Sequence, residues 1–508
     1  MARHTLRPPG HARPAGQPAR IYSGQVEDIT EFDAARIEAS RIEPSEGSDF
    51  IPRTSLHVTL IAAPMQLTEQ QVLALAPDSG SASNGKKLAQ PKQWPLLGRN
   101  ARAIWGECQG SGKNPYQVRV DLADFASKCS CPSFKFPCKH ALGLLVLAAN
   151  QPDAVAETDE TDEPEWVTSW LDKRADNAAR KEARATAKAD APVDDAAQQK
   201  RAEKRDQRVR DGLAALQVWL EDLVRNGLAR LPSEGPGLWE QAAARLVDAQ
   251  ASGLAARVRA LADLPGSRPD WPELLLAELG RLSLAVRAYE RIEQLDPPLQ
   301  QQLRQLIGYS LREDEVLAHG DTQHDCWQVI GQHIEADERV RVQRSWLIGA
   351  RSGRHALLLQ FAAGNQPFAA SWLPGTAFEG ELAFWPGAGS LRAMLKGVAT
   401  PAAAPGAFPL VRTHRQLLDA AATLLALNPW HERMATVLDA CVPAFENGQW
   451  RVVGADGDAL PLAGRDQWLW AAIAGGAPHA VAVEWDGQAV RPLGLYADGR
   501  YQVLTEVQ

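Results

Sequence analysis

The sequence is poor in cysteine and has no long apolar run, and these two shortages exclude several classes of protein. Six cysteines in 508 residues are too few for the disulfide framework of a small secreted domain. The most apolar run, 141–149, has about half of the ~18 residues that a membrane-spanning helix needs. Residues 1–20 carry four Arg and four Pro but lack the apolar core of a secretory signal. We therefore expect a cytoplasmic protein with no membrane association.

The sequence also has fewer positively than negatively charged residues. Lys and Arg number 54 against 62 Asp and Glu, which gives a formal net charge of −8. A chain this acidic is not a general coat for nucleic acid, so any basic surface must be local. The sequence also lacks an evident Ser/His/Asp arrangement or pair of carboxylates. We therefore expect a protein that is not an enzyme, and an enzyme in the C-terminal region is the third and weakest alternative.

The N-terminal part of the chain divides into three regions by composition. Residues 1–64 contain no Trp and no sustained apolar period. They fit either a disordered tail or an upstream extension of the gene model, with Met65 as the true start. Residues 65–150 predict a compact module of two strands and a helix, with a short third strand. Residues 151–204 predict a charged linker, which begins with seven acids and no base between 153 and 165 and continues as a solvated helix or a disordered tether.

The C-terminal part divides into two further regions. Residues 205–318 carry two apolar stripes spaced by three and four residues, which predict an antiparallel helical bundle. Residues 319–508 are rich in Trp and predict a mixed α+β region with strands at 340–348, 355–361 and 368–373 and a helical insert at 414–441. The whole chain is therefore predicted to be a multidomain α+β protein.

One cluster of residues in the 65–150 module predicts a metal site. Cys129 and Cys131 are separated by one residue, and Cys138 and His140 follow with the same spacing. Side chains alternate along a strand, so the first two thiols share one face, and the second pair lies at the start of a helix. Three thiolates and one imidazole are what a closed, tetrahedral zinc site requires. We predict one structural Zn²⁺ ion that stabilises a module otherwise too small to fold.

These four residues resemble the SWIM-type zinc finger, whose pattern is Cys-x-Cys, a spacer, and Cys-x-His. The segments WGECQGSGK (105–113) and FPCKHALGLL (136–145) extend the likeness to the bacterial SWIM zinc finger family proteins. The close likeness covers about a sixth of the chain, and it favours Met65 as the start. SWIM modules are similar to parts of chromatin-remodelling ATPases and Mutator-type transposases, where a role in DNA binding or protein interaction is inferred.

The predicted finger is basic although the chain is acidic. Between 65 and 150 there are ten Lys and Arg and five Asp and Glu, a net charge of +5. Lys128, Lys135 and Lys139 lie near the metal ligands and are candidate nucleic-acid contacts, with Trp94 and Phe134 available to stack on bases. A solvated face on a small domain explains the same charges. The acidic run at 153–165 suggests, as a further hypothesis, a segment that folds back and masks the finger.

Two functional hypotheses follow from these features. The first is an interaction adaptor, in which the finger, the bundle and the β-rich region are docking surfaces of a larger assembly. The resemblance implies a MoxR-type AAA ATPase or a von Willebrand factor A-domain protein as the partner. The alternative is a DNA-binding protein that uses the basic finger. The net charge of −8 favours the adaptor.

Other Cys and His residues give weaker signals. Cys108 is predicted to be a small buried residue rather than a fifth ligand. His324, Asp325 and Cys326, with His333 nearby, resemble a second metal cluster but lack a second thiol. Cys326 and Cys441 are therefore expected to be core residues.

Overall fold

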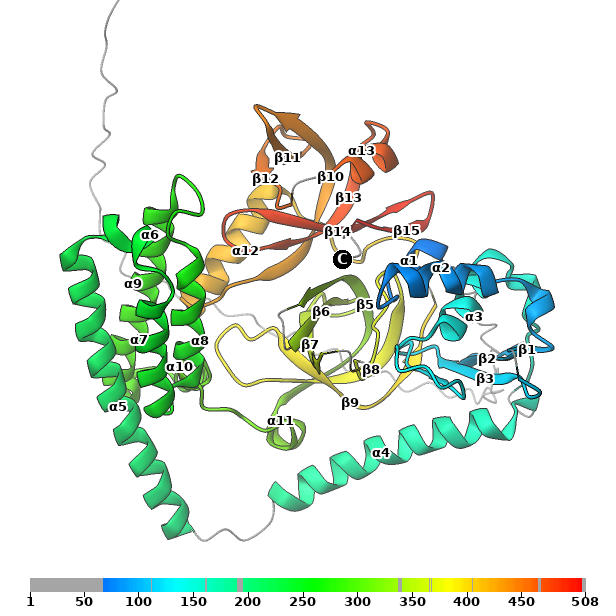
Figure 1. The fold of residues 1–508 in the computed structure, drawn as a ribbon, viewed down its shortest axis with the longest axis horizontal. Coiled ribbons are helices and arrows are strands. Elements are labelled where there is room, and N and C mark those ends of the chain that lie inside the picture. The colour runs from blue at the N-terminus through cyan, green and yellow to red at the C-terminus, as the bar shows by residue number, and fades with distance from the viewer. Residues whose placement is uncertain are drawn as a thin grey trace, which may run out of the picture. The chain divides into compact units, whose positions relative to one another are not determined.

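The computed structural model describes residues 67–504 except for short gaps at 111, 160–161, 190–194, 337–339, 365, 367, 404 and 465–466 (Figure 1). The predictions for residues 1–64, and for Met65 as the start, lie outside the described residues. Within the described part, the chain is a multidomain α+β protein with a four-stranded sheet, a six-stranded sheet and a closed barrel. None of the helices there combines the length and the apolar character needed to cross a membrane.

The predicted finger is a sheet covered by helices. Its strands run in the antiparallel order β1-β2-β3-β4, and helix α3 packs on them. Two short N-terminal helices complete the unit, and α2 lies so close to α3 that a Cβ on Gly85 would be 2.8 Å from the Cβ of Leu142. The elements are α1 (Glu69–Leu73), α2 (Ser79–Leu88), β1 (Leu96–Arg99), β2 (Ala103–Cys108), β3 (Tyr116–Asp121), β4 (Ser127–Cys129) and α3 (Lys139–Asn150).

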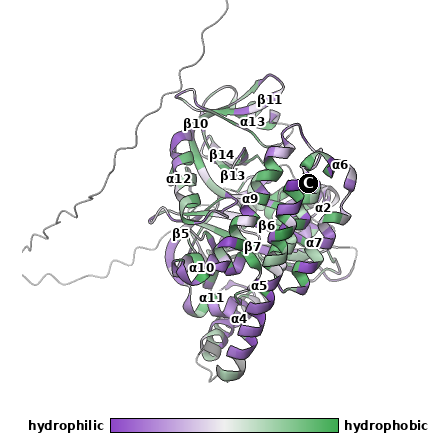
Figure 2. Cartoon of the chain, turned by 90° about the vertical axis from the view of Figure 1, so that its left-hand side faces the viewer, coloured by the Kyte–Doolittle hydropathy of each residue, from purple (hydrophilic) through white to green (hydrophobic). Residues whose placement is uncertain are grey.

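The segment predicted as a charged linker contains a helix, as one of the two alternatives expected, but part of this helix is docked on the finger rather than solvated. Helix α4 (Glu165–Ala189) consists largely of hydrophilic residues (Figure 2). Val167 and Leu171 are nevertheless buried against the finger, and the guanidinium of Arg119 lies 5.2 Å and 5.9 Å from the ring centres of Trp166 and Trp170. From its charge content alone, α4 would be expected to lie in solvent. A few apolar residues one helical turn apart are nevertheless sufficient to hold it against the finger.

The helical region is a bundle, as its apolar stripes predict. The stripe of α5 runs from Val209 to Leu223 and that of α9 from Leu275 to Tyr289, and both belong to one core. Trp239 of α7 and Trp430, from far along the chain, are buried in the same core. The helices are α5 (Asp195–Asn226), α6 (Leu231–Glu234), α7 (Gly237–Asp248), α8 (Ser252–Ala260), α9 (Trp271–Glu290), α10 (Pro297–Ile307) and α11 (Glu313–His319).

Five strands close a barrel in the order β5-β6-β7-β9-β8. The long first strand closes it, since its first half pairs with β8 and its second half with β6, with a register shift between Val329 and Gly331. Only β7 and β9 pair in parallel. This connectivity is that of an oligonucleotide/oligosaccharide-binding (OB) barrel. The strands are β5 (Asp321–Ala336), β6 (Val340–Gly349), β7 (His355–Ala363), β8 (Ala377–Phe384) and β9 (Arg392–Pro401).

The rest of the chain forms a six-stranded antiparallel sheet in the order β12-β11-β10-β13-β14-β15. Two-residue turns at Asn447-Gly448 and Asp498-Gly499 have positive φ at both positions, the geometry that suits tight hairpins. The elements are α12 (His414–Leu427), β10 (Met434–Glu446), β11 (Gln449–Val453), β12 (Ala459–Pro461), α13 (Trp468–Ala474), β13 (His479–Trp485), β14 (Val490–Ala497) and β15 (Arg500–Val503).

Two predicted elements of this region are wrong. Residues 368–373 form no strand, because they cross from the barrel toward the finger, where Ser371 N donates to Asp124 O. The helical insert ends at Leu427, ahead of Asn428-Pro429, and residues 434–441 belong to strand β10. Proline disfavours the helical conformation in the residue before it, which explains the early end.

The sheet covers one face of the barrel. Trp346 and Ile348 of β6 pack on Val437 and Leu493 of the sheet. OB barrels commonly bind their ligands on the second and third strands, which here are β6 and β7. The central part of that face is therefore occupied by the protein itself.

We expect acid to weaken the fold through His355, at the start of β7. Burial and the neighbouring charge of Arg412 lower the pKa of His355 from 6.5 to about 4, and its Nε2 is buried without a hydrogen-bond partner in the described structure. The folded state therefore favours the neutral ring. The contribution of this neutral ring to the free energy of unfolding is fully present above pH 6.5. It is lost as the pH falls from 6.5 to about 4, which lowers the free energy of unfolding by about 3 kcal/mol.

Urea unfolding of the wild type and of His355→Gln at several pH values tests this expectation. The difference between the two proteins should shrink as the pH falls through that window. A difference that does not change with pH would contradict the assignment.

Candidate metal centre

The four predicted ligands come from the end of one strand and the start of one helix. Cys129 ends β4, Cys131 follows in the loop, Cys138 is the N-cap residue of α3, and His140 lies in the first turn of that helix. The loop between them reverses the chain, so residues that are close in sequence converge on one point. Their ligand atoms all lie within 4.8 Å of one another.

The distances suit a tetrahedral metal ion. His140 Nδ1 lies 3.8 Å from Cys129 Sγ and 3.9 Å from Cys138 Sγ. Ligands bound to zinc at ~2.0–2.3 Å in a tetrahedron are separated by about 3.6–3.8 Å. Three thiols and one imidazole would fill all four positions and leave none for a reactive water. The donor set therefore fits a structural zinc ion.

The protein encloses this donor set. Cys138 and His140 are buried, while Cys129 and Cys131 are half-buried. The ring of Tyr116, on β3, lies 4.9 Å from the imidazole of His140. Sequence reasoning missed this contact. The alternation of β3 places Tyr116 on the same side as Val118, but only the packing of α3 brings His140 to it.

Cys138 is the most acidic of the thiols. The hydrogen bond from Cys129 lowers its pKa most, and the His140 side chain and the N–H groups at the start of α3 add to this, so the pKa falls from 9.0 to about 4 despite burial. The pKa of Cys129 rises in turn, because its proton is shared with Cys138. A thiolate at Cys138 is the form that binds a metal ion.

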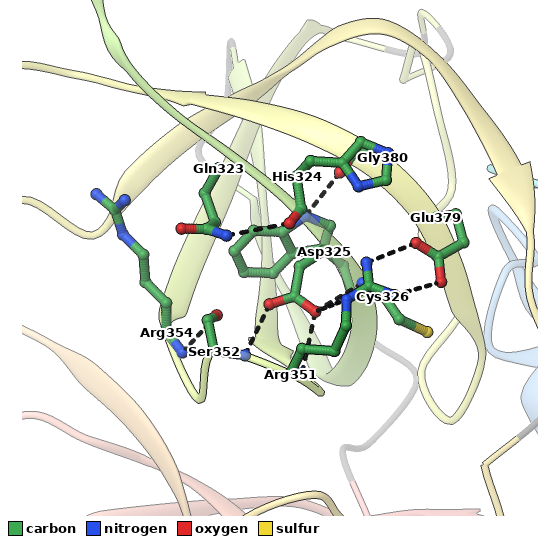
Figure 3. Close-up of polar contacts among 10 residues, drawn as sticks. Gln323, His324, Asp325, Cys326, Arg351, Ser352, Arg354, Glu379 and Gly380 are labelled. Carbon is green, nitrogen blue, oxygen red and sulfur yellow. Dashed lines mark hydrogen bonds and ion pairs between the residues drawn. The ribbon is translucent and has the colours of Figure 1, made fainter. Parts of the chain in front are cut away.

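The weaker candidates do not join a metal site. Cys108 is fully buried in β2, and burial raises the pKa of its thiol to about 11. Asp325 lies in β5, and its carboxylate accepts hydrogen bonds from the N–H groups of Cys326, Arg351 and Ser352 (Figure 3). It thereby holds the turn between β6 and β7. Among the described residues, the cluster at Cys129 is the only one with the arrangement of a metal site.

One of the three candidate lysines is paired with a carboxylate. All three are exposed, but Lys135 Nζ makes an ion pair with Asp78 at 2.9 Å. Phe134 is 90% exposed beside the metal loop. Trp94 is buried, and its indole N–H donates to Leu88 O. The expectation that Trp94 is free to stack is therefore wrong.

The acidic run contacts another edge of the finger. Glu157 lies 3.6 Å from Arg99 at the end of β1, and Glu163 accepts a hydrogen bond of 2.7 Å from Asn100. Backbone hydrogen bonds also join Arg99 to Ala156 and Thr158. The run does fold back, as hypothesised, but these contacts extend the β1 edge rather than cover Lys139.

Comparison with known families decides the identity of this centre. A family model described as the SWIM zinc finger matches residues 116–148, which include all four ligands. Residues 116–148 therefore form a SWIM zinc finger. A second model, the SWIM-associated four-helix bundle domain, matches residues 204–307, so the bundle is a recognised companion of the finger. No curated protein and no solved structure matches the chain.

Proposed function

We propose that this protein is a zinc-stabilised interaction protein that binds a protein partner through an aromatic patch formed by its C-terminal sheet and helix α13. The aromatic patch consists of Phe445, Trp450 and Trp468. Their ring centres lie 4.9–6.5 Å apart. Phe445 is 54% and Trp468 62% exposed, whereas Trp450, whose ring contacts both, is buried. Grouped, exposed aromatic side chains are typical of the centres of protein interfaces.

The metal centre supports this role indirectly. A closed zinc site does no chemistry, and its contribution is a rigid finger fastened to the rest of the chain. The resemblance to bacterial SWIM proteins points to a MoxR-type AAA ATPase or a von Willebrand factor A-domain protein as the partner. Cytoplasmic location and the absence of catalysis are part of the same proposal.

Substitution of the aromatic patch tests the proposal. We expect Trp468→Ala and Phe445→Ala each to weaken binding to the purified partner by about 10- to 100-fold, because truncated aromatic anchors commonly cost that much. Titration calorimetry with the AAA ATPase and the A-domain protein of the same source measures the change. Phe361→Ala on β7 is the matched control, since Phe361 is 60% exposed but belongs to the barrel.

Binding should also change little with salt, because the surface is apolar. Equal affinities of the patch variants and the control for the partner would contradict the assignment of the aromatic patch as the binding surface. Failure of both candidate partners to bind the wild type would contradict the adaptor assignment.

DNA binding by the finger is the second candidate, and exposed Phe134 and Lys139 favour it. The ion pair of Lys135 with Asp78 weakens it, since a phosphate would have to compete with that carboxylate. Contacts of this kind would bind duplex DNA through its backbone and weaken steeply with salt. Binding of DNA by Lys139→Glu, measured by fluorescence anisotropy, tests this candidate.

A further inference from the structure

A cleft of about 630 Å³ lies between the finger, helix α4 and the barrel. Its volume is in the usual range for ligand sites. The finger contributes Lys128 and Phe136, α4 contributes Trp170 and Arg174, and the barrel side contributes Arg341 and Phe368.

Specific contacts fix the walls of the cleft. Gln71 Nε2 donates to Pro374 O at 2.7 Å in a buried position, and Gln70 Nε2 donates to Val503 O at 2.9 Å. On the other wall, Arg174 of α4 makes ion pairs with Asp121 and Asp124 of the finger at 3.2 Å and 2.5 Å. The cleft is therefore built by tertiary contacts between three parts of the chain.

The charged side chains on the cleft wall are cationic. Lys128, Arg174 and Arg341 line it, and no Asp or Glu does so among the described residues. The charge of Arg174 is balanced by the two aspartates behind it. Lys128 is exposed and has no ion-pair partner in the described part of the chain. Such a wall favours an anionic ligand.

Arg341 is held in place without a carboxylate. Its guanidinium donates to the carbonyl oxygens of Gly364, at 2.9 Å, and Gln366, and lies 5.0 Å from the ring centre of Phe368. Carbonyl oxygens orient the guanidinium but, being uncharged, do not neutralise its positive charge. Arg341 is therefore a preorganised cation facing the cleft.

Aromatic rings accompany these cations. Phe136 is 42% exposed, and Trp170 and Phe368 are half-buried. Cations interleaved with partly exposed rings are the combination that binds single-stranded nucleic acid, because phosphates pair with the charges while bases stack on the rings. A duplex keeps its bases stacked internally, so these rings cannot reach them.

We infer that this cleft binds a short segment of single-stranded nucleic acid, with phosphates at Lys128 and Arg341 and a base against Phe136, Trp170 or Phe368. The cleft includes Phe136 of the metal loop but not Phe134 or Lys139. It is also independent of the aromatic patch. A free nucleotide carries the same phosphate and base, so the test separates the two sources.

The test is a fluorescence-anisotropy titration of the full-length, zinc-loaded protein. The probes are a labelled single strand of about 12 nucleotides, the corresponding duplex, and a mononucleotide as competitor, at about 50 and 200 mM salt. We expect the single strand to bind at least about tenfold more tightly than the duplex, and the mononucleotide to compete only at much higher concentration.

Variants locate the site. We expect Lys128→Glu and Arg341→Gln each to weaken single-strand binding about tenfold and to reduce the salt slope by about one. Lys139→Glu is the matched control, because it makes the same charge change on an exposed finger residue that does not line the cleft. Phe136→Ala should weaken binding by about fivefold or more through lost stacking.

The outcomes are distinct. Equal losses of affinity in Lys128→Glu and Lys139→Glu, with preference for the duplex, would show that nucleic acid binds to the finger surface and not in the cleft. Tight binding of the mononucleotide would show that the ligand of the cleft is a free nucleotide and not a strand. No binding by the wild type at low salt would overturn the inference and leave the adaptor proposal standing.

Photo-crosslinking keeps the inference testable if Arg341→Gln folds poorly. A strand that carries 4-thiothymidine should crosslink to peptides containing Phe136, Trp170 or Phe368 in the wild-type protein. Crosslinks confined to other peptides would overturn the assignment of the cleft.

Discussion

Removal of zinc should unfold the finger, 67–150, and this is the largest effect we expect. Structural zinc contributes about 10–16 kcal/mol of apparent binding free energy in isolated fingers, whereas whole domains are stable by only about 5–15 kcal/mol. Without the metal, three thiols and an imidazole remain within 4.8 Å of one another with no ion to hold them together. The start of α3 and the end of β4 should therefore separate.

Chelation with release of zinc followed by a metallochromic dye measures this effect, with hydrogen exchange of α3 as the structural readout. We expect one zinc ion per chain, and the same loss of protection in Cys138→Ser. Cys108→Ala is the matched control, since Cys108 is buried in the same unit but is not in the cluster. Retained protection after metal loss, or zinc loss from the control, would show that the ion does not hold the finger.

Glu484→Ala should cost about 3–5 kcal/mol, the usual result of breaking a buried ion pair. Glu484 is 1% exposed on β13. It accepts hydrogen bonds from Trp346 Nε1 of the barrel at 2.7 Å and from Arg433 at 2.9 Å. Truncation would leave the indole N–H without its partner and the guanidinium with only Glu335, at 3.6 Å.

Urea unfolding with a probe on the barrel and one on the sheet measures this cost. Glu446→Ala is the control, because Glu446 is an exposed carboxylate on the same sheet, and its effect should stay within about 0.5 kcal/mol. A loss below about 1 kcal/mol in Glu484→Ala would mean that water replaces the carboxylate at the interface.

The features predicted correctly from the sequence are local ones. The stripes from Val209 and Leu275 predict helices because their spacing alone defines a buried face. The errors at 368–373 and 428–441 arise where short apolar runs fit more than one structure.

The docking of α4 could not be predicted in the same way. Its charges indicate solvent exposure, and its binding to the finger depends on Arg119, which lies about fifty residues earlier. The closure of the barrel by β5 and β8 and the burial of Glu484 are likewise contacts between distant segments. Local periodicity carries no information about such partners.

The sequence by itself determined the metal centre, because all four ligands lie within twelve residues and one turn of chain brings them together. Only the tertiary structure decided which surfaces remain for partners. It paired Lys135 with Asp78, buried Trp94, covered the barrel face at Trp346, and placed Lys128 with Arg341 on one cleft. Exposure and charge balance depend on neighbours that are remote in sequence, and folding alone brings those neighbours together.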